Sequence, residues 1–174
     1  RQAAADGLGD AISRELGSLG MGGARVAVSV DPLLIGGVEV AGARLSSTGR
    51  DRVEFLIAPN PGEEPRPLAR VASGGELSRA LLALKRVLAE GGAVGLYVFD
   101  EVDTGVGGAV AEVIGQKLSD VAAHHQVLCI THAPQVAAYG DQHLHVHKAV
   151  AGGRTFSRVR VLDPEQRVDE LGRM

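Results

Sequence analysis

Hydrophobic side chains recur along the first part of the chain at two spacings, which predict one helix followed by strands. A spacing of three or four residues predicts an amphipathic helix over Gln2–Leu19. Alternation with a period of two predicts strands over Arg25–Val30, Val38–Leu45 and Arg52–Ala58, with glycine-containing turns between them. We therefore expect an antiparallel meander with one buried face.

After a loop at Pro59–Pro67, the pattern changes to continuous apolar runs that alternate with helices. Helices are expected over Glu76–Glu90 and Ala109–Ala123, and strands over Leu96–Phe99 and Val127–Ile130. The leucines that share one face of the first of these helices are Leu77, Leu81, Leu84 and Leu88. Apolar strands that alternate with helices indicate a parallel sheet covered on both faces, and hence an α/β fold.

The last part of the chain is expected to form two more strands and a closing helix. The strands cover Gln142–His147 and Thr155–Val161, and the helix covers Pro164–Met174 with Asp163 as its N-cap. Alternation along the first strand puts three imidazoles on one face, those of His143, His145 and His147. A transition-metal site would need a fourth ligand from elsewhere, so we interpret this face as the polar side of a half-buried strand.

Composition narrows the classes of protein that fit this pattern. Of 174 residues, 45% are hydrophobic and only 3% aromatic, and the formal net charge is -3. These values argue against a nucleic-acid surface built from stacking rings or a basic stripe. The single cysteine, Cys129, lies in an apolar run and indicates a buried thiol in a reducing compartment. No apolar stretch is long enough for a membrane span, and a chain that starts at Arg1 is expected to be part of a longer protein.

Four short segments carry residues suited to phosphate chemistry, and the first is Ser73-Gly74-Gly75-Glu76 ahead of a helix. Ser73 can cap the helix, the glycines let a ligand approach the backbone, and the helix N-terminus offers free N–H groups. Together these features favour phosphate binding. Taken alone, the same four residues are better explained by a plain helix cap.

The other three segments follow the two apolar strands. Asp100 and Glu101 come directly after Leu96–Phe99, where Asp100 can hold Mg²⁺ through water and Glu101 can polarise an attacking water. Asp103 follows in a glycine-containing loop, and His132 comes after the next strand. The carboxyl ends of parallel strands meet at one sheet edge, so these side chains are expected to share a site. Their succession within one α/β unit favours phosphoryl transfer over four separate structural roles.

In this order, the segments resemble the motifs of ABC-type ATPases. Val71–Arg79 is similar to the ABC signature, Val98–Glu101 to Walker B with its glutamate, Val102–Gly105 to the D-loop, and Thr131-His132 to the H-loop. More narrowly, the runs FDEVDTGVGG and CITHAPQVAAYGDQHLHVHK resemble the C-terminal head half of the RecN family, the SMC-like DNA repair ATPases of bacteria. Glu76, where many transporters have glutamine, fits the SMC-like branch.

The resemblance implies an ABC-ATPase half-domain over residues 21–174, with parallel core strands, flanking helices and added antiparallel strands. Residues 1–20 would be the returning end of a coiled-coil arm or a packing helix. Glu101 and His132 would be catalytic and Asp100 would hold Mg²⁺, all acting on the ATP of their own head. The resemblance assigns ATP binding to Ser73, Gly74, Gly75, Glu76 and Asp103. The signature residues among them would complete the site of a second head, in a head-to-tail dimer that sandwiches ATP.

A P-loop is missing from this sequence, which contains no Gly-Lys pair. The resemblance places the P-loop in an N-terminal half of the same head, so we expect this chain alone neither to bind ATP tightly nor to hydrolyse it. The full-length protein would act on DNA in the bacterial cytoplasm, associated with the nucleoid and not with a membrane. Two alternatives stay open: a fragment of an ABC transporter ATPase, and a non-catalytic interaction domain. The Asp100-Glu101 pair argues against the second alternative.

Overall fold

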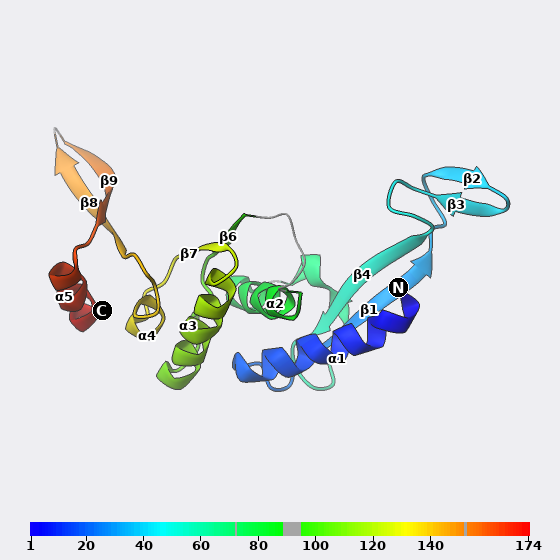
Figure 1. The fold of residues 1–174 in the computed structure, drawn as a ribbon, viewed down its shortest axis with the longest axis horizontal. Helices are drawn as coiled ribbons and strands as arrows, with labels where there is room; N and C mark the ends of the chain where they lie inside the picture. Colours follow the sequence, from blue (N-terminus) through cyan, green and yellow to red (C-terminus); the bar gives the residue numbers. More distant parts are fainter. Residues whose placement is uncertain (72, 89–94, 152) are drawn as a thin grey trace. The chain divides into compact units, whose positions relative to one another are not determined.

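Helices and strands occur in nearly the order that the sequence predicts, and they divide between two units (Figure 1). The computed structural model describes residues 1–71, 73–88, 95–151 and 153–174. Unit 1 comprises Arg1–Ala93 and unit 2 comprises Val94–Met174. The division between an arm segment and a head lobe after residue 20 stays a prediction, and the helix before that point is part of unit 1.

Helix α1 packs against a three-stranded antiparallel sheet in unit 1 (Figure 1). The elements of this unit are α1 (Gln2–Ser18), β1 (Arg25–Pro32), β2 (Val38–Val40), β3 (Ala43–Leu45), β4 (Asp51–Ala58), β5 (Arg66–Pro67), the 3-10 helix η1 (Leu68–Arg70) and α2 (Gly74–Val87). Gly9 is required where α1 crosses β1, because a Cβ there would lie 2.8 Å from the carbonyl oxygen of Val26. At the same place the Ser13 hydroxyl accepts from the Val26 N–H and donates to the Gly9 carbonyl, each over 2.8 Å.

The predicted three-stranded meander is wrong, because β1 pairs directly with β4 and Val38–Leu45 is not one strand. In this sheet, whose strand order is β1-β4-β5, Arg25 stands opposite Ala58 and β5 pairs with the other edge of β4. The segment between β1 and β4 instead forms a separate hairpin, β2–β3. Its two turn residues, Ala41 and Gly42, have φ angles of 48° and 79°. Positive φ at both central residues gives a two-residue turn the twist that a hairpin needs.

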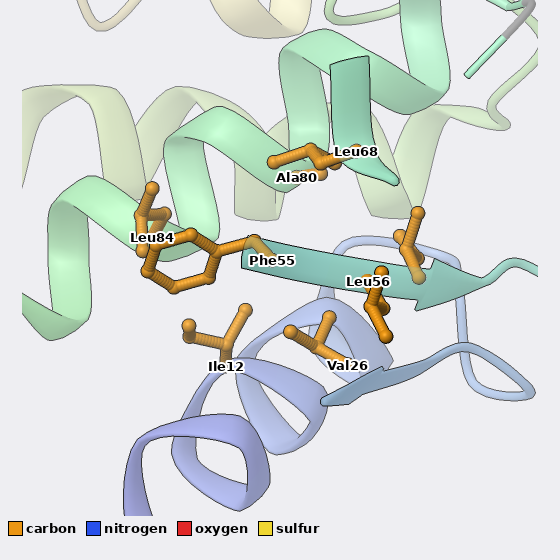
Figure 2. A pocket seen from close by; sticks show the side chains of 8 residues that line it. Ile12, Val26, Phe55, Leu56, Leu68, Ala80 and Leu84 are labelled. Carbon is orange, nitrogen blue, oxygen red and sulfur yellow. The ribbon is translucent and has the colours of Figure 1, made fainter. Parts of the chain in front are cut away.

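A small gap in the core of unit 1 is surrounded by aliphatic side chains and the ring of Phe55 (Figure 2). The side chains around this gap are those of Ile12, Val26, Phe55, Leu56, Ile57, Leu68, Ala80 and Leu84. None of them is polar, so the gap is a packing feature and not a nucleotide site.

Helix α2 buries a different face from the one that its leucines predict. Leu84 lines the core, but Leu81 and Leu88 are exposed, and the buried positions include Ala80, Leu82 and Ala83. The small side chains let α2 pack closely against α1. The helix predicted over Glu76–Glu90 is confirmed from its start to Val87, whereas residue 90 lies outside the described residues.

Unit 2 contains the parallel pair of strands that the sequence predicts. Its elements are β6 (Leu96–Phe99), α3 (Gly108–Ala122), β7 (Gln126–Cys129), α4 (Pro134–Ala137), β8 (Leu144–Ala151), β9 (Arg154–Val161) and α5 (Pro164–Arg173). Strands β6 and β7 run in parallel, with Leu96 opposite Gln126 and Phe99 opposite Cys129. The N-cap of α5 is also as predicted, because the Asp163 carboxylate accepts from the Gln166 N–H over 2.9 Å.

The prediction that this parallel sheet is covered on both faces is wrong for the part of the chain that the structure describes. Phe99 is buried on one face, where Tyr97, Val127 and Cys129 are half-buried. The other face is open, and its exposed side chains are Leu96, Val98, Leu128 and Ile130. A parallel sheet normally has helices on both faces, so an open apolar face of this kind is unusual.

The β8–β9 hairpin also turns its aliphatic side outward, although its histidine face is predicted to be the polar side of a half-buried strand. Val146 is 64% exposed, whereas the imidazoles on the opposite face are half-buried. The rings of His145 and His147 stack 5.4 Å apart, and Nε2 of His145 lies 3.8 Å from Oε1 of Glu170. Among the described residues, no group of three potential ligands could hold a metal, and no helix is both long and apolar enough to cross a membrane.

Candidate nucleotide site

The ends of β6 and β7 bring the predicted catalytic residues to one edge of the sheet. The Ile130 N–H donates to the Phe99 carbonyl over 2.9 Å, so the two strands end level with each other. The chain then continues into Asp100 and Glu101 after β6, and into His132 after β7. All three side chains are exposed, that of His132 by 81%. The arrangement predicted from the order of the motifs is therefore present within unit 2.

Glu101 is held in a backbone conformation that few side-chain-bearing residues adopt. Its φ is 57°, and its carbonyl accepts from the Thr104 N–H over 3.0 Å, which closes a tight turn just beyond β6. The turn leaves Glu101 exposed and buries the next two side chains, those of Val102 and Asp103. The left-handed region costs a residue with a Cβ about 1–2 kcal/mol. Strain of this kind concentrates at functional sites, where it sets the direction of a side chain.

Asp103 is buried and binds the loop that carries His132. Its Oδ2 accepts from the Thr131 hydroxyl over 2.6 Å, from the His132 N–H over 3.2 Å and from the Ala133 N–H over 3.1 Å. Oδ1 is also buried and has no hydrogen-bond partner among the described residues. The three donors offset the desolvation of a carboxylate that is only 3% exposed. The assignment of Asp103 to ATP binding stays a prediction. The contacts of Asp103 with Thr131 and Ala133 were not indicated by any local pattern in the sequence.

Cys129 lies at the end of β7, and the pKa of its thiol depends on burial and on the carboxylates near this sheet edge. Burial, together with the nearby carboxylates of Asp103 and Asp100, raises the pKa of the Cys129 thiol from 9.0 to about 12. The thiol is therefore protonated at neutral pH, which agrees with the prediction of an unreactive cysteine, but the residue is half-buried and not buried as predicted. The same carboxylates make the edge negative, which suits a divalent cation.

We expect Cys129 in the folded protein to react with a disulfide reagent such as DTNB at least about 100-fold more slowly at pH 8 than in urea, because only the thiolate is nucleophilic. Since the folded pKa is raised, the stability that the protonated thiol contributes is full below about pH 9 and is lost as the pH rises towards 12. The measurement is the rate of thiol labelling with and without denaturant. Equally fast labelling of the folded protein would contradict a partly buried Cys129 with negatively charged carboxylates nearby.

The signature segment lies in unit 1 and begins α2. Ser73 is exposed and caps the helix, its Oγ accepting from the Glu76 N–H over 3.4 Å, as predicted. Gly74 is exposed and Gly75 is buried, while residue 72 lies outside the described residues. Arg79, one turn further along, is buried, and this burial lowers the pKa of its guanidinium while Glu76 partly opposes the shift. The helix thus presents a serine and an open backbone at its N-terminus, the geometry that favours an anion.

Comparison with known proteins identifies the class of fold. No protein-family model matches the chain. A solved SMC ATPase structure, from work on ATP-driven dimerization and DNA stimulated activation, matches 97% of the chain and 91% of its own length, with 18% identity and a TM-score of 0.53. The Smc head domain of Pyrococcus yayanosii matches 97% of the chain and 29% of its own, with 19% identity and a TM-score of 0.60. The fold is therefore that of an SMC/ABC-type ATPase head.

Sequence similarity narrows this class to one family. DNA repair protein RecN of Xylella fastidiosa is 44% identical over all 174 residues, which are 30% of that protein. RecN of Streptomyces coelicolor is 47% identical over 180 aligned residues, which include the whole chain and 31% of that protein. The chain belongs to the RecN family, and it spans about 30% of the length of these curated relatives.

Proposed function

We propose that this chain is the C-terminal part of an ATP-hydrolysing head in a RecN-type protein that acts in DNA double-strand-break repair. The observation that carries the proposal is the shared edge of β6 and β7, where Asp100, Glu101 and His132 are all exposed. The P-loop would come from another segment of the same protein. The term complete head is used below for this chain together with that P-loop segment.

Each residue at the edge has a part in attack by water on the γ-phosphate of ATP. Asp100 would supply carboxylate oxygens for Mg²⁺, through water, at the sheet edge next to Glu101. Mg²⁺ supplies neutralisation of the phosphate charge when it is bound. Glu101, exposed just past the strand, orients and polarises the attacking water. His132 reaches the γ-phosphate from the neighbouring loop.

The signature segment would serve the nucleotide of a second head. Ser73 and Gly74 are exposed at the start of α2, where backbone N–H groups and a hydroxyl can meet a γ-phosphate that another head has bound. ATP-driven dimerization is described for one of the structural relatives, which supports a head-to-tail pair that sandwiches ATP. DNA would be contacted through the full-length protein, in the bacterial cytoplasm close to the nucleoid.

Two open apolar surfaces support assembly with a P-loop segment. One is the bare face of β6–β7, on which Val98 is 58% exposed, and the other is the aliphatic side of β8–β9, on which Val146 is 64% exposed. Surfaces of this kind are rare on an isolated domain and mark places where another segment packs. Because the chain spans only about 30% of its relatives, a longer RecN-type protein would have ample sequence to provide that segment.

The test compares ATP turnover of this chain alone with that of the complete head. We expect phosphate release only from the complete head, because the chain contributes the carboxylates but no lysine loop for the phosphates. Val98→Asp should leave the chain folded yet prevent assembly and turnover, since it puts a charge on the open β6–β7 face. Val168→Asp on α5, where the side chain is 70% exposed, is the matched control and should leave turnover unchanged. Turnover by the chain alone, or an assembled head with none, would refute the proposal.

A further inference from the structure

We propose that Asp103 is a positioning residue, which holds the loop carrying His132 in place at the sheet edge and couples it to the loop carrying Glu101. The proposal rests on the proposed function, because positioning matters only if His132 and Glu101 act on a nucleotide. It differs from the role that the resemblance assigns to Asp103, which is direct contact with ATP.

Among the described residues, the hydrogen bonds of the Asp103 side chain run to the His132 loop. One oxygen, Oδ2, accepts from three consecutive residues: the hydroxyl of Thr131 and the backbone N–H groups of His132 and Ala133. The Ala133 N–H also lies 3.0 Å from the Thr131 hydroxyl, so the loop closes on itself around the carboxylate. Two successive backbone groups bound to one fixed acceptor leave the loop little freedom to shift.

Burial argues against a direct contact between Asp103 and a nucleotide. The residue is 3% exposed, and Oδ2 is already shared by three donors. Oδ1 has no partner among the described residues, but this atom is buried too. A phosphate would also be repelled by a carboxylate, whereas the neighbouring His132 side chain is 81% exposed and free to reach one.

The position of Asp103 connects the two catalytic loops. It lies two residues after Glu101, inside the turn that the Thr104 N–H closes on the Glu101 carbonyl. The same Oδ2 lies 3.4 Å from Nδ1 of His132, so the carboxylate is close to the imidazole as well as to the loop backbone. A shift of either loop is therefore passed to the other through this carboxylate.

The experiment measures kcat, KM for ATP and hydrogen exchange of the loop amides in the complete head, for Asp103→Ala, Asp103→Asn and Thr131→Val. For Asp103→Ala we expect kcat to fall by about 100-fold, because a displacement of about 1 Å at a catalytic group has an effect of this size. KM should change by less than about 3-fold, because ground-state binding of ATP is retained. Exchange of the His132 and Ala133 amides should accelerate.

Two less disruptive variants test whether a loss of activity in Asp103→Ala comes from misfolding. Asp103→Asn keeps the shape and one acceptor oxygen, and Thr131→Val removes only the hydroxyl donor. Both should lose less kcat than Asp103→Ala. The variant with the larger gain in amide exchange should show the larger loss of kcat. Asp169→Asn makes the same chemical change at an exposed position of α5 and should leave every readout unchanged.

Three results separate the outcomes. A raised KM with unchanged kcat and unchanged exchange would make Asp103 a nucleotide ligand and overturn the proposal. Unchanged exchange in Asp103→Ala would show that the carboxylate does not hold the loop, which also overturns it. Absence of turnover in the wild-type complete head would instead overturn the proposed function, and the exchange rates would still decide whether Asp103 fixes the His132 loop.

Discussion

Replacing Glu101 with glutamine in the complete head is expected to lower ATP turnover by about 10²- to 10⁴-fold, the usual contribution of a general base. Glutamine keeps the size and the hydrogen-bonding reach of the side chain but cannot accept a proton from water. Asp100 and the signature segment are untouched, so ATP binding should persist and the engaged pair of heads should last longer. The measurements are phosphate release, nucleotide affinity and the lifetime of the head dimer.

The backbone at Glu101 supplies a control for this experiment. Because Glu101 has a φ of 57°, glycine at this position removes a steric penalty of about 1–2 kcal/mol. Glu101→Gly should therefore lose turnover as Glu101→Gln does while being more resistant to urea, whereas Glu101→Gln should unfold like the wild type. Loss of activity in both variants, with stability raised in only one, separates catalysis from folding. Wild-type turnover in Glu101→Gln would remove Glu101 from the role of base.

Truncating Leu16 to alanine is expected to destabilise unit 1 by about 2–5 kcal/mol, the range for a buried leucine whose removal leaves a cavity. Leu16 is 0% exposed on the face of α1 that packs against β1 and α2. A loss of this size is a large part of the roughly 5–15 kcal/mol that stabilises a typical domain. The measurement is the midpoint of urea unfolding, with the slope of the transition compared between variants.

The matched control for Leu16 is Leu88→Ala, which removes the same atoms where the side chain is 42% exposed. Its cost should stay below about 1 kcal/mol, because little cavity forms at a surface position. Equal effects of the two substitutions would mean that α1 does not belong to the core of unit 1. That outcome would favour an independent arm helix over the packing that the structure shows.

Features that depend on residues close together in the sequence could be predicted from the sequence. The pattern of apolar residues predicted α1, β1, β4, β6, α3 and β7, because a helical or alternating period, or a continuous apolar run, is a property of each segment alone. The caps at Ser73 and Asp163 were equally local, since each side chain bonds an N–H three residues ahead. The shared edge of Asp100 and His132 followed because parallel strands end on the same side of a sheet.

Features that depend on contacts between distant residues were decided only by tertiary structure. Asp103 and Thr131 are 28 positions apart, and no periodic signal marks such a bond. Turn geometry split Val38–Leu45 into a hairpin, and close packing against α1 chose the alanine side of α2 over its leucines. The outward aliphatic faces of β6–β7 and β8–β9 have the same origin. Alternation along a strand says which side chains share a face, but the surrounding segments decide which face is buried.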